Sequence, residues 1–206
     1  MKKAVIILLL FSVFNIKVTG ADTVSRQLPR VTFGAEWGYV ATFFSYHSYN
    51  YFSTEGYRMS EKHGAFGIGS NGEVNLHIGY NLNHHWNIAL YAGFTGLMNI
   101  HNAVPVSIRA TRYFGNFPEA DRWLAFIDLG SGISIKREPQ ELATAKFGAG
   151  YRISLSRDTK LDFIAAVRLT HTHPQIIDEG DLITLEWTNR NSAFLAAVSV
   201  GMSLTF

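Results

Sequence analysis

The chain has 206 residues, of which 47% are hydrophobic and 14% aromatic, and its formal net charge is +2. It has no cysteine, which excludes a disulfide scaffold and a lipid anchor on an N-terminal cysteine. No basic tract follows the first residues, so we expect no nucleic-acid partner. The length suits one domain.

The first twenty residues have the order of a secretory signal peptide. Lys2 and Lys3 form a basic start, residues 4–14 are apolar, and small residues follow at Gly20 and Ala21. An apolar run this short cannot cross a hydrocarbon core of about 30 Å, so a membrane anchor is the weaker interpretation.

We therefore expect a cleaved leader, residues 1–21, and a single mature domain, residues 22–206. Cleavage removes three of the 18 basic residues and none of the 16 acidic ones, which changes the net charge to about −1. The three are Lys2, Lys3 and Lys17. The basic isoelectric point of the full chain therefore says nothing about its partners.

Segments in which apolar and polar residues alternate recur through the mature chain. Such alternation predicts half-buried strands, and segments of this length are long for a soluble protein but suit a tilted transmembrane strand. No later segment is apolar for long enough to predict a transmembrane helix. The predicted strands are residues 31–44, 72–82, 86–97, 104–114, 123–135, 142–155, 161–171 and 193–206.

The connections between these strands alternate in length. The turns "NLNHH", "GNFPEAD" and "SRDTK" are short, whereas residues 46–70 and 172–192 form long connections. Short turns on one side and long loops on the other are typical of an outer-membrane barrel. We therefore expect an all-β, eight-stranded, antiparallel, up-and-down barrel with short periplasmic turns, longer outer loops and both chain ends on the periplasmic side.

The two faces of each strand differ in composition. In residues 193–206, for example, Phe194, Val198 and Val200 share one side, and Ser199 and Ser203 share the other. A soluble lipocalin-like barrel would place the apolar side inward, and a membrane barrel would place it outward.

Two features favour the membrane orientation. Glycine recurs on the polar face, where it makes room for long side chains in a narrow lumen. Aromatic residues gather at the strand ends near the short turns, as expected at headgroup level. The glycines are Gly34, Gly38, Gly79, Gly93, Gly130, Gly132, Gly148, Gly150 and Gly201. The aromatic residues are Tyr80, Trp86, Tyr113, Trp123, Tyr151 and Phe206.

The terminal aromatic Phe206 and the segments "VPVSIRATRYF" (residues 104–114) and "LAFIDLGSGISI" (residues 124–135) carry a family resemblance. The chain resembles the porin-like outer-membrane β-barrel family of Gram-negative bacteria, among the small eight-stranded OmpA/OmpX-type barrels. The resemblance implies residence in the outer membrane. It also implies that Phe206 is a terminal insertion signal for the barrel-assembly machinery.

The polar face carries four acids and four bases. Charges in so narrow an interior must pair, because an unpaired buried ion costs several kcal/mol. We expect a structural charge network that fills the lumen, with the individual partners left open, and keep an ion path as the alternative. The network comprises Glu36, Glu73, Asp128, Asp162, Arg109, Lys146, Arg152 and Arg168, with His77 among them.

Two other kinds of chemistry find little support. His171 and His173 share a face and could begin a metal site, but no third ligand is evident beyond the acids of the same loop. A lipid A-modifying enzyme needs a serine beside a histidine and an acid, and the His-x-Ser-Asn motif of deacylases is absent. We therefore expect no enzyme activity, no metal and no cofactor.

The tyrosine-rich outer segment offers the remaining hypothesis. Such side chains make adaptable contacts with a surface ligand, or they form an upper aromatic girdle on strands that extend past the membrane. We expect a monomer that contacts outer-membrane lipids and lipopolysaccharide and has a structural or surface-interaction role through its outer loops; a small porin is the alternative. The residues are Tyr46, Tyr49, Tyr51, Phe52 and Tyr57.

Overall fold

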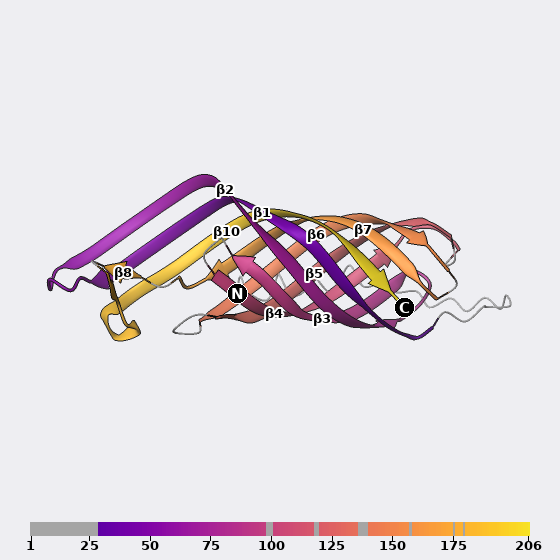
Figure 1. Cartoon of the computed structure of the whole chain (residues 1–206), viewed down its shortest axis with the longest axis horizontal. Helices are drawn as coiled ribbons and strands as arrows, with labels where there is room; N and C mark the ends of the chain where they lie inside the picture. Colours follow the sequence, from indigo (N-terminus) through magenta and orange to yellow (C-terminus); the bar gives the residue numbers. More distant parts are fainter. Residues whose placement is uncertain are drawn as a thin grey trace, which may run out of the picture.

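The computed structural model describes residues 29–97, 101–117, 120–135, 140–156, 158–174, 176–178 and 180–206. The predicted leader, residues 1–21, lies outside these ranges. Eight long strands close into one antiparallel barrel in which neighbours along the chain are neighbours in the sheet (Figure 1). They are β1 (Val31–Phe52), β2 (Arg58–Asn81), β3 (Trp86–Leu97), β4 (His101–Tyr113), β5 (Arg122–Ile135), β6 (Glu141–Ser154), β7 (Lys160–Thr172) and β10 (Thr188–Thr205).

The predicted eight-stranded, up-and-down barrel is thus confirmed. The described residues contain one helix, the short 3-10 turn η1 (Leu185–Trp187), so no described helix has the length and apolar character to cross a bilayer.

The last strand closes the ring against the first. Phe33 and Phe206 exchange two backbone hydrogen bonds, with N···O distances of 3.1 and 2.8 Å, and their rings stack with centroids 5.6 Å apart. The C-terminal residue therefore lies at the short-turn end of the barrel, where Figure 1 places the chain end.

The barrel is apolar outside and polar inside, as the alternation predicted. On β2, Leu76 and Ile78 are 66% and 56% exposed, whereas Glu73 and Asn75 between the outward positions are 5% and 4% exposed. In water this arrangement would expose a band of apolar side chains to the solvent. It suits a bilayer, where a closed barrel also leaves no backbone polar group of the wall unpaired.

Three strands are much longer than the others. β1, β2 and β10 have 22, 24 and 18 residues, against 12 to 14 for the rest, and they run beyond the barrel as a projecting sheet (Figure 1). We call this projection the outer arm: residues 43–52 of β1, 58–69 of β2 and 188–192 of β10.

The prediction that residues 46–70 form a loop is therefore wrong. Only a tight turn between β1 and β2, with Gly56 at a positive φ of 86°, and the two unpaired residues Gly67 and Ile68 interrupt the pairing. The arm has polar residues on both faces, so the alternation that reveals the transmembrane strands fades there although the backbone pairing continues.

The second long connection, residues 172–192, also contains paired structure. Its described part forms a small hairpin of β8 (Ile177–Asp178) and β9 (Asp181–Leu182), followed by η1, before β10 starts at Thr188. The predicted start of this last strand, residue 193, is therefore five residues too late.

A β-bulge separates the arm from the barrel. The register shifts between Thr42 and Phe44 against both neighbours. Phe43 is an extra residue of β1 relative to β10, whereas two residues of β2, Gly67 and Ile68, lie opposite it. Such a bulge bends a strand and reverses which residues face inward. Figure 1 shows the bend where β1 and β2 leave the barrel.

Candidate functional site

The lumen holds the eight predicted charges, and two transverse rows of the sheet bring most of them together. Arg109, Asp128, Lys146 and Arg168 are successive cross-strand partners on β4, β5, β6 and β7. In a second row Arg152 lies opposite Asp162. Because each of these residues falls on the inward parity of its strand, the register alone aligns the charges.

Arg109 is the centre of the first cluster. Its guanidinium reaches across the lumen to Glu36 with N···O distances of 2.5 and 3.1 Å, and it donates to Asp128 at 2.9 and 3.0 Å. The rings of Tyr91 and Phe126 lie 3.9 and 4.3 Å from its central carbon. The Arg109 guanidinium therefore binds two carboxylates and also contacts two aromatic rings.

Glu73 is the centre of the second cluster. It forms an ion pair with Lys146 and a second one with Arg168 at 2.9 Å, and Asn75 donates to it at 3.0 Å. Arg168, which is 2% exposed, also donates to Thr95 at 2.8 Å. These bonds join opposite walls across the lumen, since Glu73 lies on β2 and its two bases on β6 and β7.

The third cluster lies towards the short-turn end. Arg152 and Asp162 form a two-point ion pair with N···O distances of 2.6 and 2.7 Å. The Tyr113 ring lies between two guanidinium groups, those of Arg152 and Arg122, each 4.3 Å from its centroid.

Tyr113 corrects one prediction. The sequence analysis placed it among the outer aromatic residues, but its side chain is 6% exposed and faces the lumen. Its parity already indicated this, because it lies four residues after Arg109 on the same strand. Tyr80, Trp123 and Phe206 do face outward, being 46%, 64% and 41% exposed.

Two lumen cations were missed at this end, Arg122 and Lys160, which are 6% and 7% exposed. Each starts a strand and shares the inward parity of a predicted site residue, Asp128 on β5 and Asp162 on β7. Arg122 donates to the backbone oxygen of His84 in the first short turn at 2.7 Å.

Glycine makes room for this packing. A Cβ atom on Gly148 would overlap the Phe126 ring, which itself stacks on Arg109. One on Gly93 would overlap the carbonyl oxygen of Val74. A methyl group at either position would displace a wall or a ring, so these glycines allow the side chains to fill the lumen.

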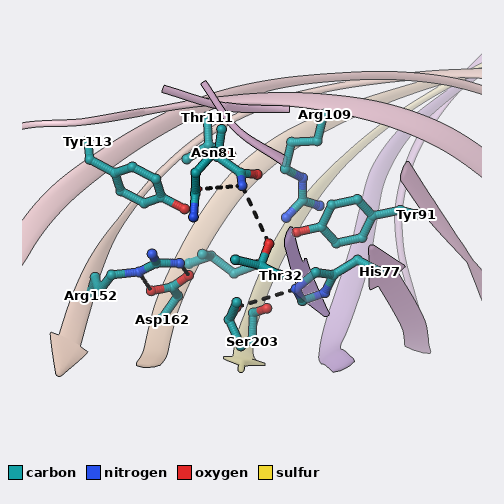
Figure 2. A pocket seen from close by; sticks show the side chains of 13 residues that line it. Thr32, His77, Asn81, Tyr91, Arg109, Thr111, Tyr113, Arg152, Asp162 and Ser203 are labelled. Atoms are coloured by element: carbon teal, nitrogen blue, oxygen red, sulfur yellow. Dashed lines mark hydrogen bonds and ion pairs between the residues drawn. The ribbon is translucent and has the colours of Figure 1, made fainter. Parts of the chain in front are cut away.

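A small polar cavity lies between the first and third clusters. Side chains from opposite walls converge on it (Figure 2), and it has a volume of about 20 Å³, enough for about one water molecule. Thr205 lies 3.3 Å from His77 Nε2, whereas the Nδ1 atom of His77 and the Oγ atom of Ser203 have no hydrogen-bond partner among the described residues.

The histidines outside the lumen do not gather into a metal site among the described residues. His171 and His173 lie edge to face at 5.1 Å on the outer wall, near the rim. His171 contacts Ser192 Oγ at 2.9 Å, and His173 contacts the backbone oxygen of Glu141 at 3.4 Å. Glu179, one of the acids weighed as a further ligand, lies outside the described residues.

The outer arm forms a second region of interest. On its inner face His47 lies opposite His63, and Tyr49 Oη lies 2.8 Å from His47 Nδ1. Burial, with the neighbouring His63 second, lowers the pKa of His47 below the usual 6.5. Tyr51 is only 9% exposed, so it offers little contact surface to a partner.

An inside-out wall, ion pairs across the lumen and an aromatic belt at the short-turn end define an integral outer-membrane β-barrel with a side-chain-filled interior. No protein-family model matches the sequence, and no curated protein matches it.

Solved structures of outer-membrane barrels are similar to the chain. The N-terminal β-barrel domain of Pseudomonas aeruginosa OprF has 17% identity and a TM-score of 0.45, covering 87% of this chain and 100% of that one. P. aeruginosa OprG has 10% identity and a TM-score of 0.48, with coverage of 86% and 96%. Neisserial surface protein A has 12% identity and a TM-score of 0.45, with coverage of 84% and 97%.

Proposed function

We propose that this outer-membrane barrel is a surface-interaction protein that uses its outer arm to bind an extended segment of another protein. One observation carries the proposal. Among the described residues, β2 pairs with β3 only from Glu73 onward, whereas its residues 58–66 pair with β1 and Gly67 and Ile68 lie in the bulge, so the other edge of residues 58–69 has no strand beside it.

An open strand edge is a template for another strand. Its backbone N–H and C=O groups add an extended peptide by main-chain hydrogen bonds, and alternate side chains supply the specificity. Proteins usually shield such edges with charge, proline or a covering element. Here Arg58, Glu61 and Lys62 place charge on the outer part of the edge. Nearer the barrel it carries Phe66 and Ile68, which are 83% and 86% exposed.

The arm has the position that such a role requires. It lies at the end opposite the short turns, which is the outer side of the membrane in barrels of this layout. Nine residues of β1 beyond the bulge extend about 30 Å at about 3.3 Å per residue. Tyr46, Phe52 and Tyr57, which are 40%, 45% and 49% exposed, add apolar contact area to it.

The lumen supports an interaction role better than a transport role. Glu36–Arg109 and Glu73–Arg168 cross the interior, and the cavity beside Arg109 holds about one water. The purified barrel in planar bilayers is therefore expected to show no conductance steps. Regular steps that change size in the Glu73→Gln variant would instead favour the small porin.

Peptides displayed on phage test the proposal about the arm. A library of random twelve-residue peptides is panned on the barrel in nanodiscs and on a barrel in which a two-residue turn replaces residues 45–66. Peptides that bind only the complete barrel are expected to alternate apolar and polar residues. They should slow amide hydrogen exchange in residues 58–69.

A variant with lysine at two positions of the open edge tests whether that edge binds the peptides. The Phe66→Lys/Ile68→Lys barrel should lose these peptides, because charged side chains on an edge strand oppose pairing. The matched control is Phe117→Lys, which changes a 73%-exposed aromatic residue in a short turn. Equal peptide binding by both variants, or no peptide preferring the complete arm, would contradict the proposal.

We infer no catalytic role, and lipid A from cells that overexpress the barrel tests this inference. Its mass spectrum should match that of cells with an empty vector. A loss of the mass of one acyl chain would identify an enzyme.

A further inference from the structure

The outer wall of the barrel has a groove near its outer rim, with a volume of about 610 Å³. Two rows of outward side chains enclose it on β4 to β7. The lower row runs Val106, Ser131, Ala143 and His171, which are successive cross-strand partners. Ser131 and Ala143 are small side chains between two larger ones, so the wall is indented there.

The groove is lined mainly by apolar side chains on β4 and β5 and by polar ones towards β7. Val104 and Ile133, 43% and 56% exposed, lie opposite each other in the upper row. Glu141 and His173 continue that row towards the rim, and both line the groove. Hydrocarbon-facing residues therefore lead directly into a group of hydrogen-bonding residues.

We propose that this groove binds lipid A, the outer-leaflet glycolipid, with one acyl chain along Ala143 and a phosphate or sugar hydroxyl at His171 and His173. Continuity with the lipid-facing belt identifies a lipid as the occupant, because the groove opens on the face that the bilayer covers. Its place at the arm end of the barrel identifies the outer leaflet, in which lipid A resides.

Hydrogen bonds at the rim orient the side chains that would contact such a headgroup. Ser192 Oγ and the backbone oxygen of Glu141 each engage one ring nitrogen of a histidine, at 2.9 and 3.4 Å, and so orient the two imidazoles. The second ring nitrogen of each histidine is left to bind a ligand. The Glu141 carboxylate can accept hydrogen bonds from sugar hydroxyls, whereas a histidine N–H can donate to a phosphate.

Inside a bilayer the gain comes from shape, not from leaving water. Lipid already surrounds the wall, so a bound acyl chain gains only the close packing that a chain in the fluid bilayer lacks. A side chain that fills the indentation should therefore abolish specific binding without removing the barrel from the membrane.

The test is native mass spectrometry of the complete barrel, extracted from outer membranes in a mild detergent. The wild-type barrel is expected to retain one lipid A. Ala143→Trp should reduce this population about tenfold, which corresponds to about 1.4 kcal/mol. The matched control is Ala149→Trp, an outward position on the same strand six residues nearer the short turns, and it should retain the lipid.

A second variant covers the case in which Ala143→Trp does not fold. His171→Phe/His173→Phe leaves the groove open and removes the polar rim, so it should also release lipid A. Folding of every variant is checked by heat-dependent migration in gels. Equal retention of lipid A by Ala143→Trp and Ala149→Trp, or phospholipid as the only retained lipid, would overturn the proposal.

Discussion

The outer arm is a continuation of three strands of the barrel, but the two regions differ in how their strand edges are paired and in how exposed their side chains are. Within the wall β2 pairs on both edges, and its inward residue Glu73 is 5% exposed between two cations. In the arm the same strand pairs on one edge, and Ile68 is 86% exposed.

Closure explains the difference. A closed ring satisfies every backbone group of the wall and confines polar side chains to a narrow lumen, where they must pair. Past the rim the ring opens, so the arm keeps an edge available for association. The barrel is therefore expected to be sensitive to single changes that the arm tolerates.

The largest expected effect is loss of the central cation. Arg109→Leu leaves Glu36 and Asp128 buried without it, so the free energy of unfolding should fall by about 3–5 kcal/mol. Arg58→Leu makes the same chemical change in the arm, where the guanidinium of the exposed Arg58 donates to Asn50 at 2.9 Å, and should cost less than about 1 kcal/mol, the scale of an exposed polar pair. Urea unfolding in phospholipid vesicles measures both, and equal losses would remove the contrast between the regions.

A smaller effect is expected from filling a glycine site in the wall. Gly93→Ala places a methyl carbon against the Val74 carbonyl oxygen and Asn75 Oδ1, closer than van der Waals contact allows, which should cost about 1–3 kcal/mol. Gly67→Ala is the arm counterpart, since nothing lies within 4 Å of the position that its methyl group would take. The same unfolding assay should show no loss there, and a destabilised Gly67→Ala would mean that the arm is as tightly packed as the wall.

Phe206 tests how the ring closes. If its aromatic ring is an insertion signal, Phe206→Ala should reduce the folded barrel in cells by about tenfold, a change of about 1.4 kcal/mol in the effective barrier. Phe33→Ala removes the other ring of the stacked pair and should have a weaker effect. Equal losses in cells would show that Phe206 acts only through its packing.

The smallest expected effect is a pH response confined to the arm. Because the pKa of His47 is lowered in the folded arm, the neutral imidazole is favoured there, and stability is lost as the pH falls through about 6.5 towards the folded pKa. Amide exchange in residues 45–51 should accelerate between about pH 7 and pH 5 relative to the barrel. His47→Gln should remove this response, and an unchanged response in the variant would assign it to another group.

The two regions also differ in how far the sequence predicts them. The transmembrane strands follow from alternation, because lipid and lumen impose opposite chemistry on successive residues. The same parity placed Glu36, Asp128 and Arg168 in the lumen. Partners such as Glu73 and Arg168 lie across the interior and depend on the register of the whole ring, which no local pattern encodes.

The sequence predicted the arm only as one of two interpretations, strands that extend past the membrane, and did not give its bounds, for the complementary reason. Water reaches both its faces, so His47 and Glu61 carry no alternation signal, and the bulge at Phe43 shifts the parity between the two regions. The outer groove was also missed. It depends on Ser131 and Ala143 lying side by side on neighbouring strands, which only the register reveals.

The central claim is that neighbouring residues of the last strand face lipid and lumen in turn. The chain has no cysteine, so a nitroxide can be attached at a single introduced site. In lipid vesicles the label at Val200→Cys should collide far more often with oxygen, which concentrates in the bilayer, than with a water-soluble nickel complex. The label at Ser199→Cys should be shielded from oxygen, and the reverse pattern, with Ser199 in contact with lipid and Val200 shielded, would contradict the account.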